Sequence, residues 1–232
     1  MDADEPAYIQ VANRSIAYRL RKGASPTLLF LPGYASDMEG AKALALDAFA
    51  DRRGLAMLRL DYSGTGSSAG RFEDGTLDRW LAEVLAAIDA LTSGPLIIIG
   101  SSMGGWLALH ATLDRPNRIK ALVGIAAAPD FTDWGFTDAV AAEAAGIAPG
   151  FWESGQRLRL LKDAINVECP VRLIHGEHDR DVPVEIAMRT LAALRSADVQ
   201  LTIIKGGGHR LSEPHEIDAI LRTVAELLES NS

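Results

Sequence analysis

The sequence has a single cysteine in 232 residues and no apolar run long enough to cross a bilayer. One cysteine excludes a disulfide framework and a zinc site built from several thiolates. A membrane-spanning helix needs about 20 apolar residues, so none is expected. Three of the first five residues are acidic, the opposite of a signal or transit peptide. We therefore expect a cytoplasmic protein without integral membrane association.

Basic side chains are also scarce. The 23 Lys and Arg residues are outnumbered by 31 Asp and Glu residues, which gives a formal net charge of −8. An acidic surface repels phosphate backbones, so nucleic-acid binding would need a local basic patch. The strongest basic cluster, at 157–162, places two Arg and one Lys among leucines, as an amphipathic helix does. No nucleic-acid partner is expected.

Short β-rich runs alternate with longer amphipathic stretches along the chain. This pattern is typical of an α/β protein with a mainly parallel sheet. The length and the 48% apolar content suit a single domain spanning 1–232. The unbroken apolar runs 27–31 and 96–99 fit central strands that are covered on both faces.

Eight strands and five main helices are expected from this pattern. The first two strands are joined by Asn13 and Arg14, which favours an antiparallel hairpin. Ser212 is a candidate N-cap for the last helix. The expected strands are 8–12, 16–20, 27–31, 56–61, 96–99, 121–125, 171–175 and 200–204. The expected helices are 37–53, 77–91, 103–115, 184–195 and 214–229.

One segment, 129–169, interrupts the alternation. It holds a concentration of aromatic side chains, namely Phe131, Trp134, Phe136, Phe151 and Trp152. Long excursions inside compact domains are usually functional. We predict that this segment is a short lid inserted over a site, and the alternative is a surface helix pair that uses aromatic residues for packing.

A Gly-x-Ser-x-Gly motif directly follows the apolar run 96–99 and precedes a stretch suited to a helix. It extends from Gly100 to Gly104, with Ser102 at its centre. In this strand–turn–helix setting the motif is the nucleophile elbow of α/β-hydrolases, which exposes the serine hydroxyl above the sheet. Ser102 is therefore the candidate nucleophile. Ser101 lacks the flanking glycines, and a tight Gly-Ser turn is the alternative without chemistry.

A serine hydroxyl becomes nucleophilic when a histidine, itself oriented by a carboxylate, accepts its proton. His209 lies in a glycine-rich loop after the expected strand 200–204. Catalytic groups of open α/β sheets gather at the carboxyl ends of the strands, so His209 is the expected base. The other four histidines are expected to serve packing, capping or support of the site: His110, His175, His178 and His215.

The carboxylate is expected in the loop that follows strand 171–175. Asp179 and Asp181 both qualify by chemistry. Asp179 fits the His-Gly-x-x-Asp register seen across the hydrolases and is preferred, whereas Asp181 suits the cap of a helix opened by Pro183. The chain order serine, acid, histidine is then that of these folds.

An oxyanion hole needs two backbone N–H donors. The amide of Met103, directly after the candidate nucleophile, is one expected donor. The amide of Tyr34 is the other, because Gly33 allows the loop after strand 27–31 to turn inward. No metal or organic cofactor is implied. The glycine-rich stretch 61–68 fits neither phosphate-binding motif, and packing is the expected role of Cys169.

With these residues placed, the chain resembles the α/β-hydrolase superfamily over nearly its whole length. More narrowly, it resembles the branch that contains a mitochondrial depalmitoylating thioesterase, which also cleaves acyl glucuronides. The branch-specific likeness lies in the blocks around Tyr34, Trp106 and Cys169. The resemblance implies a Ser102–Asp179–His209 triad and an S-acyl or O-acyl bond as the substrate.

The expected activity is hydrolysis of an acyl ester or thioester through an acyl-enzyme, on a small-molecule or S-acylated substrate. Four aromatic residues of the 129–169 segment are expected to bind the acyl group: Trp134, Phe136, Phe151 and Trp152. One alternative is a carboxylesterase that acts on small or xenobiotic esters. The other is a non-catalytic ligand-binding protein that uses the same fold.

Overall fold

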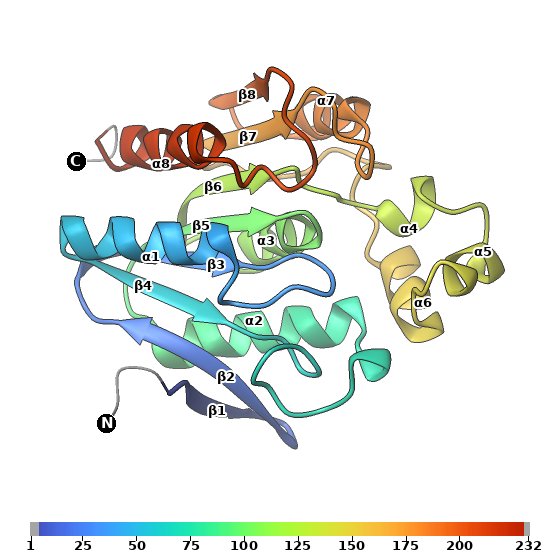
Figure 1. Ribbon diagram of the computed structural model, residues 1–232, viewed down its shortest axis with the longest axis horizontal. Coiled ribbons are helices and arrows are strands. Elements are labelled where there is room, and N and C mark those ends of the chain that lie inside the picture. The colour runs from blue at the N-terminus through green and yellow to red at the C-terminus, as the bar shows by residue number, and fades with distance from the viewer. Residues whose placement is uncertain (1–4, 230–232) are drawn as a thin grey trace.

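The computed structural model describes residues 5–229, in which eight strands form one sheet (Figure 1). The strand order is β1-β2-β4-β3-β5-β6-β7-β8. β1 pairs antiparallel with β2, β2 pairs antiparallel with β4, and every other pairing is parallel. The eight-stranded, mostly parallel sheet and its edge hairpin are thus confirmed. The strands are β1 Ala7–Val11, β2 Arg14–Arg21, β3 Ala24–Leu31, β4 Leu55–Leu60, β5 Leu96–Ser101, β6 Ile119–Ile125, β7 Val171–Gly176 and β8 Val199–Ile204.

Helices cover both faces of the sheet (Figure 1). Successive residues of a strand point to opposite faces, so Leu28 and Phe30 of β3 pack with α1 and α8, whereas Leu29 and Leu31 pack with α2 and α3. Side chains of α7 also pack in the hydrophobic core that contains α2 and α3. The five helices are α1 Ala41–Arg53, α2 Leu77–Leu91, α3 Met103–Asp114, α7 Val184–Ala193 and α8 Pro214–Glu229.

The start of α1 differs from the prediction, which began the helix at 37. The carboxylate of Asp61, at the end of β4, accepts the Met38 amide at 2.7 Å, and Asp37 accepts the Glu39 amide at 2.9 Å. These bonds hold 37–39 in a turn, so that the helix begins at Ala41.

The two predicted helix caps are wrong. Pro183 occupies the N-cap position of α7 without a side-chain cap bond, so Asp181 does not cap that helix. The Ser212 hydroxyl donates to the Arg210 carbonyl at 3.0 Å instead of capping α8. Glu216 caps the start of α8 instead, because its carboxylate accepts a hydrogen bond from the Glu213 amide at 2.8 Å.

The 129–169 segment forms three short helices beyond the carboxyl ends of the parallel strands (Figure 1). They are α4 Phe131–Trp134, α5 Ala139–Ala144 and α6 Pro149–Arg157. α6 packs on the start of α2, where the Ser154 hydroxyl accepts the Leu77 amide at 2.8 Å. Its role as a lid stays a prediction. No helix within residues 5–229 combines the length and the hydropathy that crossing a bilayer requires.

Candidate active site

Ser102 stands on the turn between β5 and α3 with a positive φ of 54° and a ψ of −119°. A non-glycine residue is rare in this region, and such strain persists only where the surroundings hold it. Here the Ser102 amide donates to the Ile125 carbonyl at 2.9 Å, and the Ser102 carbonyl accepts the Ala128 amide at 3.0 Å. Two bonds to β6 and the chain that follows it therefore fix the serine backbone.

The glycines of the motif are required by close backbone approach. A Cβ on Gly100 would lie 2.2 Å from the Gly104 carbonyl oxygen, and a Cβ on Gly104 would lie 2.2 Å from the Leu31 carbonyl oxygen. Both distances are far inside van der Waals contact. The glycines thus allow the strand–turn–helix unit to close against β3, which leaves the Ser102 side chain at the carboxyl edge of the sheet.

Ser102, His209 and Asp179 form a continuous hydrogen-bonded chain. The Ser102 Oγ lies 3.0 Å from His209 Nε2, and His209 Nδ1 lies 2.9 Å from Asp179 Oδ2. A carboxylate only accepts, so Nδ1 carries the proton and Nε2 is free to accept from the serine. This is the proton path that a general base requires.

Asp179 is held as a carboxylate although its side chain is fully buried. Burial by itself raises the pKa of Asp179, but hydrogen bonds from His209 and from the Val182 and Asp181 amides outweigh this effect and leave the pKa below its ordinary value. Both amides donate to Oδ1, at 2.8 and 3.0 Å. The other carboxylate oxygen is left for His209.

The loops that carry Asp179 and His209 are fastened to each other. They follow the paired strands β7 and β8. The Glu177 amide donates to the Ile204 carbonyl at 2.9 Å, and the His178 amide donates to the Gly207 carbonyl at 2.8 Å. The sheet therefore determines the distance between the carboxylate and the imidazole.

The predicted oxyanion-hole residues lie beside Ser102. A Cβ on Gly33 would lie 3.3 Å from the Ser102 Cβ, so the loop after β3 passes directly by the serine. Within residues 5–229 the Tyr34 amide donates no hydrogen bond. Met103 is the first residue of α3, where an N–H has no acceptor within the helix. Both amides are thus available as donors.

A cavity of about 510 Å³ opens at these residues. Gly33, Tyr34, Ser102 and His209 are among the residues that line it. The cavity brings a nucleophile, a base and the loop of a candidate donor into one space, which is the arrangement that acyl transfer needs.

Part of the lining of this cavity was not predicted from the sequence. Ser36, Lys42, Arg210 and Ser212 contribute to it. The Lys42 ammonium donates to the Arg210 carbonyl, which links the start of α1 to the loop of the candidate base. No local signal marks these residues, because contact between segments so far apart in the sequence arises only in the fold.

The four aromatic residues expected to bind an acyl group do not line this cavity. Phe151 is 1% exposed and packs against Tyr34, with ring centroids 4.9 Å apart. Phe136 packs against Phe131, and Trp134 donates to the Pro129 carbonyl at 2.7 Å. Trp152 is half-buried against the core. Tyr34 is the side chain that joins this aromatic cluster to the cavity.

The remaining histidines and the cysteine lie outside the hydrogen-bonded chain. His110 Nε2 bonds to the Leu158 carbonyl at 2.8 Å, whereas His178 and His215 are exposed on the surface. His175 is buried behind Asp179. Burial raises the pKa of the Cys169 thiol to about 11, so it is protonated at neutral pH and packs as a small apolar group.

Among the residues from 5 to 229, one group of side chains has metal-ligand atoms close together. Ligand atoms of Asp179, Asp181 and His209 lie within 4.8 Å of one another. The atoms of Asp179 and His209 are already engaged with each other, with two backbone amides and with Ser102. The cluster therefore fits a proton path better than a metal site.

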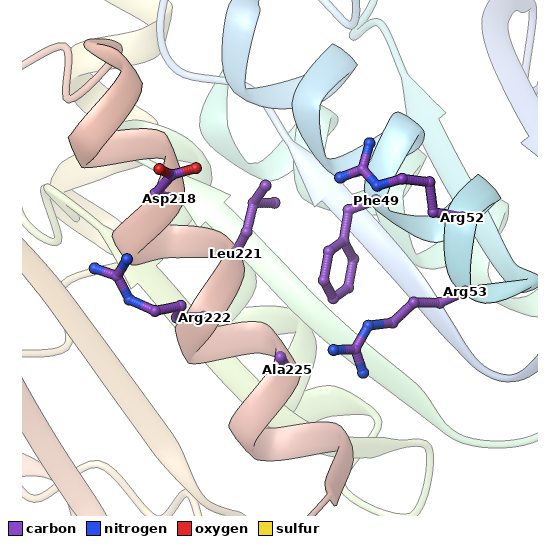
Figure 2. Close-up of a pocket in the computed structure, with 7 residues that line it drawn as sticks. All are labelled: Phe49, Arg52, Arg53, Asp218, Leu221, Arg222 and Ala225. Carbon is purple, nitrogen blue, oxygen red and sulfur yellow. The ribbon is translucent and has the colours of Figure 1, made fainter.

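A second hollow of about 360 Å³ lies between α1 and α8 and shares no lining residue with the cavity at Ser102 (Figure 2). Phe49 and Leu221 lie between the two helices, and the charged residues Arg52, Arg53, Arg222 and Asp218 line the hollow with them (Figure 2). The two helices thus gather a basic patch that no stretch of the sequence displays. The hollow contains none of the residues predicted for catalysis.

Comparison with known proteins agrees with this geometry. The family model described as the alpha/beta hydrolase fold matches residues 26–154. Human palmitoyl-protein thioesterase ABHD10, mitochondrial, is 37% identical over 238 residues, which cover 94% of this chain and 78% of the relative. The structure of mouse alpha/beta hydrolase domain-containing protein 10 is 33% identical and covers 98% of this chain and 100% of its own, with a TM-score of 0.92. A protein from Agrobacterium vitis S4, whose crystal structure is described as that of a hydrolase, is 36% identical in sequence. The match covers 96% of this chain and 98% of that chain, with a TM-score of 0.89.

These relatives correct one expectation. The ABHD10 proteins of human and mouse are named as mitochondrial, which contradicts the expected cytoplasmic location. The expectation rested on the acidic first five residues. A targeting signal is an address read by receptors and is independent of the folded catalytic unit.

The matched family and the relatives aligned over nearly the whole chain establish that this protein belongs to the α/β-hydrolase family.

Proposed function

We propose that this α/β hydrolase cleaves acyl thioesters or esters, with Ser102 as the nucleophile, His209 as the general base and Asp179 as the carboxylate that orients it. One observation carries the proposal. The Ser102 Oγ, on a strained elbow, lies 3.0 Å from His209 Nε2, and His209 Nδ1 lies 2.9 Å from Asp179 Oδ2. The three groups meet at one cavity, where an acyl carbonyl can reach the serine.

In the first half of the reaction, the Ser102 oxygen attacks the acyl carbonyl carbon while its proton passes to His209 Nε2. The Tyr34 and Met103 amides stabilise the resulting oxyanion. The bond from the carbonyl carbon to the leaving sulfur or oxygen then breaks, and His209 returns the proton to that atom. The acyl group remains on Ser102 as an ester.

In the second half, water attacks the acyl-enzyme and gives a proton to His209. The carboxylic acid is released, and the proton returns to the Ser102 oxygen. Asp179 stays ionised throughout and stabilises the imidazolium that forms in each half. The pKa of Asp179, held below its ordinary value, suits this task.

The substrate class follows from the relatives and from the neighbours of the cavity. The relatives in human and mouse are named palmitoyl-protein thioesterases, which favours a long acyl chain on sulfur. We propose that the chain is a single domain and that the 129–169 segment is its lid. We also propose that the acyl chain passes Tyr34 to reach the aromatic cluster. Phe136 and Phe151 belong to that cluster. The roles of Trp134 and Trp152 remain predictions.

A second candidate is hydrolysis of small esters without a preference for thioesters. One observation favours it, because Phe151 and its aromatic neighbours fill the space beside Tyr34 with their own side chains. The cavity at Ser102 is instead bordered by Lys42, Arg210 and the polar residues Ser36 and Ser212. A short acyl group fits such a site without movement of the 129–169 segment.

Hydrolysis of a panel of acyl esters and acyl thioesters from C2 to C16 tests both candidates. Burial of a methylene contributes about 0.8 kcal/mol, so each pair of methylenes raises kcat/KM about tenfold until the acyl site is full. We expect a rise with chain length and a loss of turnover in Ser102→Ala. Turnover restricted to C2–C4 oxygen esters would select the second candidate. Turnover that survives Ser102→Ala would refute the mechanism, and no turnover of any substrate would point to a binding protein.

A further inference from the structure

His175, the penultimate residue of β7, lies directly behind the Asp179 carboxylate and is 1% exposed. Its Nε2 atom lies 2.9 Å from the Val182 carbonyl oxygen and 3.4 Å from Asp179 Oδ2. The mechanism proposed above, through Ser102, His209 and Asp179, uses neither of the imidazole nitrogens of His175. A buried polar ring that touches the acid of a triad therefore needs an explanation.

The hydrogen-bond partner of His175 determines which ring nitrogen carries its proton. A carbonyl oxygen only accepts hydrogen bonds, so His175 must carry its proton on Nε2. That N–H donates to the Val182 carbonyl, and the Nε2 atom also lies near Oδ2 of Asp179. The second contact is too long for a good hydrogen bond, so His175 acts on Asp179 mainly through Val182.

The same bond closes a ring around Asp179. The Val182 amide donates to Asp179 Oδ1 at 2.8 Å, and the Val182 carbonyl accepts from His175. The peptide chain at Val182 is thus held on both sides, by the carboxylate that it orients and by the end of β7. The buried side chain of Val182 and the backbone bonds of Glu177 and His178 also hold this loop, and His175 adds the hydrogen bond that fixes the Val182 carbonyl.

We propose that His175 is a positioning residue that acts through Asp179, keeping the carboxylate where it holds His209 in the Nδ1–H form. The inference rests on the proposed function of the triad. It assigns to His175 a part in the reaction beyond packing, since a displaced Asp179 would let His209 exchange its ring proton between the two nitrogens. A His209 that carries its proton on Nε2 cannot accept one from Ser102.

Two substitutions separate the donor from the bulk of the ring. In His175→Gln the side-chain N–H₂ can take the place of Nε2–H, whereas His175→Phe keeps a buried ring without a donor. We expect His175→Phe to lower kcat about 10- to 100-fold, as loss of groups that orient metal-binding side chains does. KM should stay within about twofold, and His175→Gln should recover most of the lost rate.

His110→Phe is the matched control. His110 Nε2 also bonds a backbone carbonyl, that of Leu158 at 2.8 Å, but it does not contact Asp179 or His209. We expect this variant to lose stability without loss of kcat. Equal losses of kcat in the two Phe variants would mean that His175 serves only packing, and would overturn the inference.

Nitrogen-15 NMR of histidine-labelled protein supplies a readout that needs no substrate. We expect His175 to carry its proton on Nε2 in the wild type, and the Nδ1–H share of His209 to fall in His175→Phe and to return in His175→Gln. A proton on Nδ1 of His175, or an unchanged His209 in His175→Phe, would overturn the inference. If the wild type fails to turn over any acyl substrate, the proposed function fails, and the NMR result still decides the role of His175.

Discussion

At the scale of single residues, the backbone of Ser102 shows how the chain fixes a reactive group. Its φ of 54° is unfavourable for a serine, yet hydrogen bonds from two segments hold it. The role of Gly100 and Gly104 could be predicted from the sequence, because the close backbone contacts at these positions require glycine. The two glycines therefore form part of a motif that is visible in a short stretch of sequence. The strain at Ser102 follows from the same motif.

The choice of Asp179 over Asp181 is also made at this scale. The Asp179 carboxylate accepts from His209, whereas Asp181 lies on the exposed side of the loop. We predict that Asp179→Asn lowers kcat about 10⁴-fold, because an amide at this place favours the wrong His209 tautomer. Steady-state hydrolysis of the best panel substrate measures this. Asp181→Asn is the matched control, and a loss larger in this variant than in Asp179→Asn would refute the assignment.

The lowered pKa of Asp179 has a consequence for stability against pH. An acid whose pKa is lower in the folded than in the unfolded state stabilises the fold above its unfolded pKa, about 3.9. That stabilisation is lost as the pH falls through the folded value. We therefore expect the wild type to exceed Asp179→Asn in free energy of unfolding at pH 7 and the gap to narrow at pH 3. Denaturant unfolding measures the gap, and a gap that widens toward pH 3 would contradict the sign.

At the scale of elements, helix periodicity predicted the bounds of α2 and α8, but the caps and the start of α1 were missed. The helix pattern is local, whereas the turn at 37–39 is held by Asp61 of another loop. A cap depends on one side-chain rotamer, and Ser212 bonds to Arg210 in place of the helix. Such choices are made by tertiary contacts rather than by sequence pattern.

The 129–169 segment is closed at its base by one carboxylate. Asp130, which is 1% exposed and has a left-handed backbone, accepts the Leu160 and Leu161 amides at 2.8 and 2.7 Å. We predict that Asp130→Asn loses about 1–3 kcal/mol of stability, since an amide oxygen can replace only one of the two acceptors. Limited proteolysis should then cut within 129–169 earlier than in the wild type.

Asp133→Asn is the control for this prediction. Asp133 lies in the same segment, but its partner is Arg159 in an exposed ion pair at 2.5 Å. Exposed pairs contribute about 0–1 kcal/mol. Equal sensitivity of the two variants to protease would mean that the Asp130 carboxylate does not hold the segment.

At the scale of the whole molecule, the parallel sheet assembles the site from three loops. Ser102 follows β5, Asp179 follows β7 and His209 follows β8, so all three leave the same edge. The sequence could predict this meeting because parallel strands end at one edge. The contribution of Lys42 and Arg210 to the cavity lining could not be predicted, since these two residues come together only through the fold.

The distribution of charge was another feature of the whole molecule that the sequence concealed. A net charge of −8, with no basic cluster larger than the three basic residues at 157–162, predicts an acidic surface. The structure nevertheless gathers Arg52, Arg53 and Arg222 from two helices around one hollow (Figure 2). Residues from two distant helices do not form a pattern in any short window of sequence.

The central claim is that Ser102 is the residue that forms the acyl-enzyme. Reaction with a fluorophosphonate probe, followed by mass spectrometry of the labelled peptide, tests it without knowledge of the substrate. Ser101→Ala is the matched control, because Ser101 borders the same cavity but lies at the end of β5. We predict one probe per chain on Ser102 in the wild type and in Ser101→Ala, and no label in Ser102→Ala. Label that persists in Ser102→Ala, or its absence from folded wild-type protein, would contradict the account.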